Sequence, residues 1–89
     1  MSERFSDDYV SREGRYSLGR DQTTGDYFLS VPVANRMVDY EEYYRLTPDQ
    51  YSRFIADAAA ARVFADACRD RRHDDLLILQ PGTDRGVAA

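Results

Sequence analysis

Cysteine and histidine each occur only once in this chain of 89 residues, as Cys68 and His73. One cysteine cannot form an intramolecular disulfide, and the two residues together do not supply the four ligands of a structural zinc site. Five positions on a helix separate their side chains by about 140°, too far for a nucleophile and its base. We therefore expect no catalytic residue, no metal site and no cofactor, and we predict that the protein is not an enzyme. Cys68 is interpreted as a core residue and His73 as a helix-end residue.

Lysine is absent, and all twelve basic residues are arginine. Together with the abundance of alanine, this is typical of a GC-rich bacterial coding sequence. Sixteen acidic residues leave a net charge of -4, which repels a phosphate backbone, so we expect no nucleic-acid binding. The densest basic group is Arg69, Arg71 and Arg72, but Asp70 interrupts it and two more aspartates follow. This mixture favours a solvated helix end.

Long apolar runs are missing as well. No stretch approaches the roughly 20 apolar residues of a membrane helix, and residues 1–8 lack the apolar segment of a secretory signal. We expect a cytoplasmic protein without membrane association. The five glycines are scattered, and none lies in a phosphate-binding loop between a strand and a helix.

The length allows one domain over residues 1–89 with one modest core. Residues 1–11 are polar and mixed in charge, and we expect a flexible arm there. Residues 82–89 show no apolar periodicity, and we expect a disordered tail.

Three strands are predicted in the first half of the chain. Apolar residues alternate over residues 15–20, 26–33 and 37–46, with a turn at Asp21–Gly25 and another at Ala34–Asn35. Because the connections are short, the strands should form an antiparallel meander.

A helix is predicted to begin at Pro48, because Thr47, Pro48 and Gln50 form a capping box with proline at the first helical position. One helical face is marked by Tyr51, Phe54 and Ile55. Nearly the opposite face is marked by Val63, Phe64, Ala67 and Cys68. We therefore predict a break near Asp57, which would cap a second helix over residues 58–72. The alternative is one continuous helix, covered on one side by the sheet and on the other by a partner subunit.

The run Leu76–Leu79 is short, fully apolar and followed by Pro81-Gly82, which favours a fourth strand. The predicted fold class is α+β, with a small antiparallel sheet packed on one kinked or two short helices. The sheet would contain a three-stranded meander and a C-terminal strand, in the order β-β-β-α(-α)-β. Phe54, Phe64 and Leu77 are expected in the core.

The most unusual segment is an alternation of tyrosine and acid over residues 39–44. A strand would place Asp39, Glu41 and Tyr43 on one face, and Tyr40, Glu42 and Tyr44 on the other. Tyrosine offers a large contact area with few rotatable bonds, and flanking carboxylates can pair with a cationic partner. All six residues are candidates for partner binding. The alternative is that Tyr40 and Tyr44 face the core.

The leading functional hypothesis is a small acidic protein-binding module. It could be of the immunity or antitoxin type, masking a basic protein partner through the tyrosine and acid surface. The alternative is a structural or assembly module that self-associates, for instance as a homodimer. A small enzyme ranks third, since no nucleophile and base pair is visible.

Overall fold

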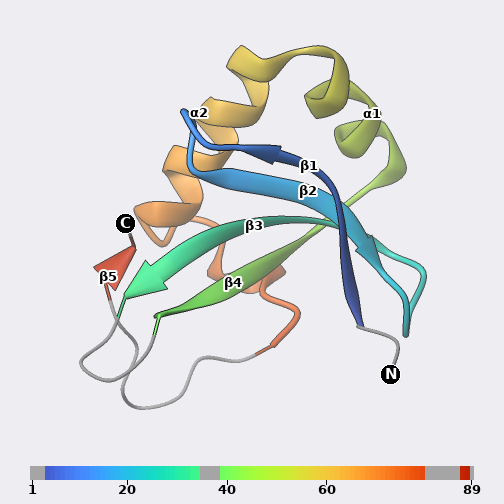
Figure 1. The fold of residues 1–89 in the computed structure, drawn as a ribbon, viewed down its shortest axis with the longest axis horizontal. Coiled ribbons are helices and arrows are strands. Elements are labelled where there is room, and N and C mark those ends of the chain that lie inside the picture. The colour runs from blue at the N-terminus through green and yellow to red at the C-terminus, as the bar shows by residue number, and fades with distance from the viewer. Residues whose placement is uncertain (1–3, 35–38, 80–86, 89) are drawn as a thin grey trace.

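An antiparallel sheet with two helices packed against one face forms the fold (Figure 1). The computed structural model describes residues 4–34, 39–79 and 87–88. The four main strands are adjacent in chain order: β1 (Phe5–Ser11), β2 (Tyr16–Asp21), β3 (Tyr27–Ala34) and β4 (Asp39–Leu46). The short strand β5 (Val87–Ala88) pairs with the end of β3. The predicted α+β class is confirmed, and β2, β3 and β4 are the predicted meander.

The predicted order of elements was wrong at both ends of the chain. β1 lies within the predicted flexible arm and pairs with β2 at the edge of the sheet. The expected strand at Leu76–Leu79 is instead the end of a 3-10 helix, η1 (Asp74–Leu76), followed by a single bridge between Leu77 and Tyr44. A four-residue apolar run does not distinguish a strand from an irregular buried segment. In this structure Leu77 is buried, but the segment does not form a strand.

Two predicted features lie mostly outside the described residues. In the tail expected over residues 82–89, the structure describes only Val87 and Ala88, as β5. Of the turn expected at Ala34–Asn35, it describes only Ala34, which pairs with Asp39 and with Val87.

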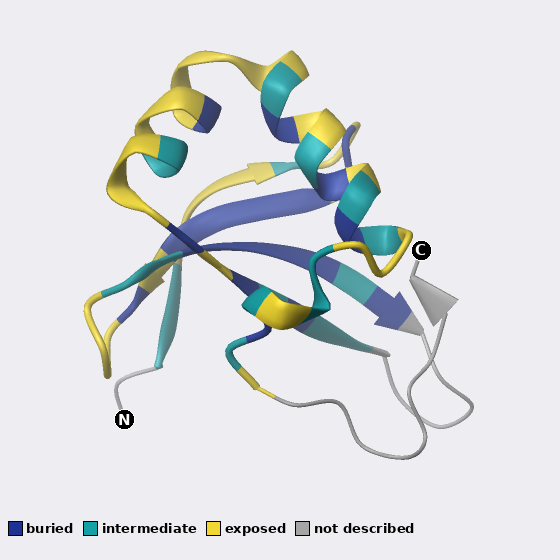
Figure 2. Ribbon diagram, turned by 180° about the vertical axis from the view of Figure 1, so that it is seen from behind, coloured by how far each residue is buried: buried dark blue, intermediate teal, exposed yellow. Residues whose placement is uncertain are grey.

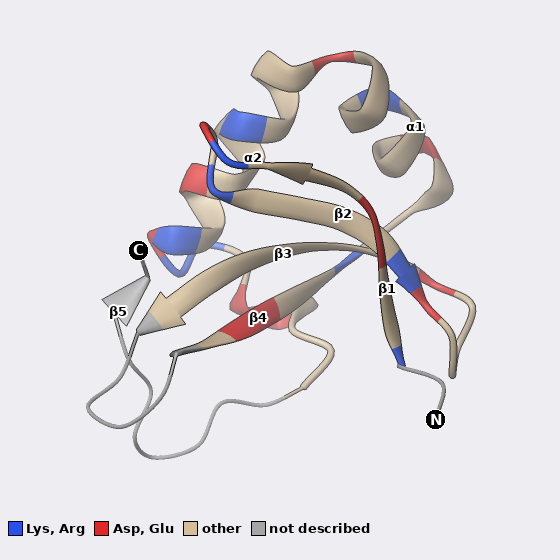
Figure 3. Ribbon diagram, in the orientation of Figure 1, with Lys and Arg blue, Asp and Glu red and all other residues tan. Residues whose placement is uncertain are grey.

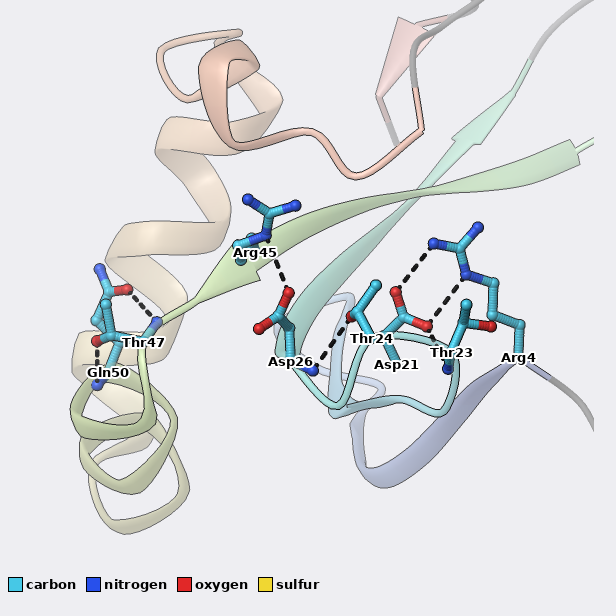
Figure 4. Close-up of polar contacts among 8 residues, drawn as sticks. All are labelled: Arg4, Asp21, Thr23, Thr24, Asp26, Arg45, Thr47 and Gln50. Carbon is cyan, nitrogen blue, oxygen red and sulfur yellow. Dashed lines mark hydrogen bonds and ion pairs between the residues drawn. The ribbon is translucent and has the colours of Figure 1, made fainter.

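The turn at Asp21–Gly25 is confirmed. The Gly25 amide donates to the Asp21 carbonyl at 2.7 Å, and Gly25 has a φ of 78°, which glycine adopts readily. The Asp21 carboxylate is fully buried and accepts two hydrogen bonds from the Arg4 guanidinium, each at 3.1 Å, and one from the Thr23 amide at 2.9 Å (Figure 4). The guanidinium of Arg4 thus ties the start of β1 to this turn.

Both helices begin as predicted. Thr47 caps α1 (Pro48–Ala56), and its capping box with Gln50 is complete (Figure 4). Asp57 ends α1 and caps α2 (Ala58–Arg69) by accepting a hydrogen bond from the Ala60 amide. α2 ends three residues before the predicted Arg72, where Arg71 takes a positive φ of 61°.

The main core lies between the helices and the sheet (Figure 2). The break at Asp57 lets Phe54 of α1 and Ala61, Ala65 and Cys68 of α2 all be buried against the sheet. Leu77 is also buried, as expected, whereas Phe64 is only half-buried and packs against Phe54. Ile55 and Val63 of the predicted apolar faces are 48% and 71% exposed, so the apolar pattern was correct only in part. The break overturns the alternative of one continuous helix.

A smaller aromatic cluster lies on the other face of the sheet. The ring of Phe5 stacks on Tyr43 at 3.7 Å and meets the edge of Phe28 at 5.5 Å. β1 passes close over Gly19, because a Cβ atom there would lie 2.0 Å from the Ser6 carbonyl oxygen. These contacts hold the edge strand β1 against the rest of the sheet.

Candidate functional site

No described helix covers the second face of the sheet, and we call this surface the open face. Directly paired residues of neighbouring strands share a face, so the register places Val10, Ser17, Ser30 and Tyr43 together there. Its exposed and half-exposed side chains are Phe5, Asp7, Val10, Pro32, Glu41, Tyr43 and Arg45.

The structure divides the six predicted partner-binding residues between the two faces. Glu42 and Tyr44 lie under the helices and are 6% and 0% exposed. The Glu42 carboxylate accepts hydrogen bonds from the Tyr44 hydroxyl at 2.9 Å and from the Tyr40 hydroxyl at 3.4 Å. Glu42 and Tyr44 were predicted to contact a partner. The structure does not support this for either residue, because both side chains are buried between the sheet and the helices. Tyr40 is half-buried.

Glu41 and Tyr43 lie on the open face. The Glu41 carboxylate accepts a hydrogen bond from the Ser30 hydroxyl at 3.3 Å, and Ser30 itself is fully buried. Tyr43 is half-buried by its stacking on Phe5. The backbone of Asp39 pairs with Ala34, and its side chain lies outside what the structure describes. The predicted alternation is thus correct, and the half of it containing Glu41 and Tyr43 remains at the surface.

A pocket of about 390 Å³ opens on this face, between the β1–β2 turn and strands β3 and β4. This volume falls within the roughly 300–1,000 Å³ of ordinary ligand pockets. Its wall combines apolar, aromatic and charged groups of both signs, including Val10, Arg12, Arg15, Tyr16, Pro32 and Glu41. It differs from a flat sheet surface because it brings these groups around one cavity.

The two arginines belong to the turn between β1 and β2, where basic positions lie on both sides of one acidic position (Figure 3). Both are exposed, and neither side chain forms an ion pair with another described residue. The Arg69 guanidinium fixes the turn by donating to the carbonyl oxygens of Gly14 and Arg15. Arg15 is held there with a φ of 55°, so the backbone that carries both guanidinium groups is anchored to α2.

Tyr16 follows Arg15 in the chain, but its ring belongs to the main core on the helix-covered face, where it packs near Tyr9 and is only 2% exposed. Burial raises the pKa of Tyr16, and the adjacent Ser11 hydroxyl opposes this rise.

The groups most often used in catalysis lie away from the open face. Cys68 is fully buried in the main core, where burial raises its pKa to about 12 and keeps the thiol protonated. His73 stacks on Phe64 with ring centroids 4.5 Å apart. Within residues 4–34, 39–79 and 87–88, no cluster of histidine, cysteine and acidic side chains has the arrangement of a metal site.

Among the helices that the structure describes, none has the length and hydrophobicity required to cross a membrane. Comparison with protein-family models, with curated proteins and with solved structures produced no match. Arguments about function therefore rest on the geometry of the open face.

The sequence did not predict a role for Arg12 and Arg15. The available signal was a pair of arginines around Gly14, directly before an aromatic residue at a strand start. The denser arginine group, considered instead, contains Arg69, Arg71 and Arg72. Within this group, Arg69 anchors the β1–β2 turn.

Proposed function

We propose that the chain is a protein-binding module whose contact surface is the open face. The observation that carries this proposal is the pocket, because it gathers apolar and charged side chains on the sheet face that no described helix covers. Interfaces of this kind combine an apolar centre with charged groups at the rim. Val10 and Pro32 would supply the apolar centre, and Glu41 and Arg12 the rim.

The open face also retains half of the tyrosine and acid pattern. Tyr43 presents an aromatic ring that is already held in place by stacking on Phe5, so little side-chain entropy would be lost on binding. Glu41 and Asp7 provide negative charge on this surface, while Arg12 and Arg15 provide positive charge at its pocket. The net charge of -4 for the whole chain favours a basic protein partner, as expected for an immunity or antitoxin type of protein.

Two exposed valines allow a matched test of this proposal. Val10 is 56% exposed on the open face, and Val63 is 71% exposed on α2. The wild type, Val10→Asp and Val63→Asp would serve as baits for affinity capture from the native host, after urea unfolding has shown that all three fold. We expect the wild type and Val63→Asp to retain a common partner and Val10→Asp to lose it. Equal capture by the two variants would contradict the use of the open face.

Self-association is a second candidate, favoured by the exposed edge of β1. Among the strands that the structure describes, this one pairs only with β2, and four consecutive residues, Asp7, Asp8, Tyr9 and Val10, are exposed along it. An unpaired edge can accept a strand from a second copy, although charged residues and bulges oppose such pairing. β1 carries both, since its register shifts between Asp7 and Tyr9. Light scattering after size-exclusion chromatography decides this point, because a strict monomer removes the candidate.

A further inference from the structure

The positive charge in the pocket is unusual for its setting. The chain has a net charge of -4, yet Arg12 and Arg15 line one cavity without an ion pair to any described residue. Glu41 lines the same cavity, but its described hydrogen bond comes from Ser30. Two guanidinium groups against one carboxylate favour a ligand with a single negative charge, and planar guanidinium matches a carboxylate well.

The other residues that line the pocket favour two further groups on a ligand. Val10 and Pro32 offer apolar surface, and the Glu41 carboxylate can accept a hydrogen bond from an N–H group. The last residue of a peptide carries a carboxylate, an N–H group and a side chain on one Cα atom. It can therefore meet the arginines, the glutamate and the apolar surface around a single cavity.

We propose that this pocket binds the C-terminal carboxylate of a peptide segment whose last residue is apolar. Arg12 and Arg15 would hold the carboxylate, and the last side chain would pack on Val10 and Pro32. Capture of a terminal carboxylate is an established mode of peptide recognition. This inference rests on the proposed protein-binding function and specifies which part of the partner enters the pocket.

The test uses the full chain and two synthetic hexapeptide libraries that contain the same set of sequences. One library ends in a free carboxylate and the other in a carboxamide, and both end in Leu, Val or Phe. Peptides retained by the immobilised protein are identified by mass spectrometry, and their affinities are measured by fluorescence anisotropy. We expect the carboxylate peptides to bind at least about tenfold more tightly than their amides, because the charge-assisted hydrogen bonds are lost with the carboxylate.

Two variants locate the binding. Arg12→Ala with Arg15→Ala should weaken binding of the carboxylate peptides by about tenfold or more, whereas Arg53→Ala, at an exposed arginine of α1, should leave it unchanged.

Several outcomes would overturn the inference. Equal binding of acid and amide peptides would exclude recognition of a terminal carboxylate. Displacement of the peptides by inorganic phosphate as readily as by a competing free-acid peptide would indicate a general anion site. A further outcome is that the immobilised protein retains neither library while Val10→Asp still loses the captured partner. That result would support the open face as a protein contact and would exclude binding of a peptide C-terminus. Failure of both experiments would reject the proposed function as well.

Discussion

Gly19 directly controls the position of β1, because its lack of a side chain lets β1 lie close to β2. A Cβ atom at this position would lie 2.0 Å from the Ser6 carbonyl oxygen and 2.8 Å from the Phe28 ring. Because the first contact is with backbone, no side-chain rotation can relieve it. The local sequence around Gly19 did not predict this contact, since it depends on a strand that the sequence did not place there.

The variant Gly19→Ala should destabilise the fold by about 1–3 kcal/mol, because β1 must move away from β2. Urea unfolding measures this change. Gly25→Asn is the control, because a Cβ there meets nothing within 4 Å and asparagine tolerates the positive φ of 78°. An unchanged midpoint for Gly19→Ala would show that β1 does not pack over β2 in this way.

Asp21 gives the fold a specific dependence on pH. Its hydrogen bond to Arg4 lowers the pKa of the buried carboxyl below the ordinary value of 3.8. A carboxyl with a lowered pKa in the folded state contributes its full stability above its unfolded pKa. That contribution disappears as the pH falls through the folded pKa.

In Asp21→Asn, the side chain no longer titrates. We expect the wild type to lose stability more steeply than the variant as the pH falls below 3.8, with the variant less stable at neutral pH. Urea unfolding from neutral pH down to about pH 2 measures both slopes. Parallel curves below pH 3.8 would contradict an Asp21 carboxyl whose ionised form is held by Arg4.

At the scale of the elements, the sequence was most informative where the signal was local. The capping box at Thr47, the break at Asp57 and the turn at Asp21–Gly25 each depend on side chains within a few residues of the backbone that they satisfy. β1 and the segment after α2 were mispredicted, because their structure depends on partners far along the chain. β1 pairs with β2 along the backbone, and its Phe5 stacks on Tyr43 of β4.

The segment after α2 offers a matched pair for testing the core. Leu77 is 8% exposed and bridges to Tyr44, whereas Leu79, two positions later, is 48% exposed. Leu77→Ala should lower the free energy of unfolding by about 2–5 kcal/mol, as for a buried leucine. Leu79→Ala should cost less than about 1 kcal/mol. Chemical denaturation measures both, and equal costs would mean that Leu77 is not part of the core.

At the scale of the whole molecule, the candidate site could be predicted only in part. Alternation along residues 39–44 separated Glu41 and Tyr43 from Glu42 and Tyr44, as the structure confirms. It could not show which of the two faces the helices would cover, because both carry tyrosine and acid. The pocket could not be predicted from the sequence for another reason. It lies between the β1–β2 turn and strands β3 and β4, and only the three-dimensional arrangement of the sheet brings these segments together.

The burial of Cys68 makes the molecule convenient for spectroscopy. Because the only native thiol is enclosed in the core and its pKa is raised to about 12, it reacts poorly with maleimide reagents. A cysteine introduced at Val63, which is 71% exposed, would therefore take up a fluorophore or spin label selectively in the native protein. Such a label on α2, away from the open face, would follow binding without removing any natural residue of the core.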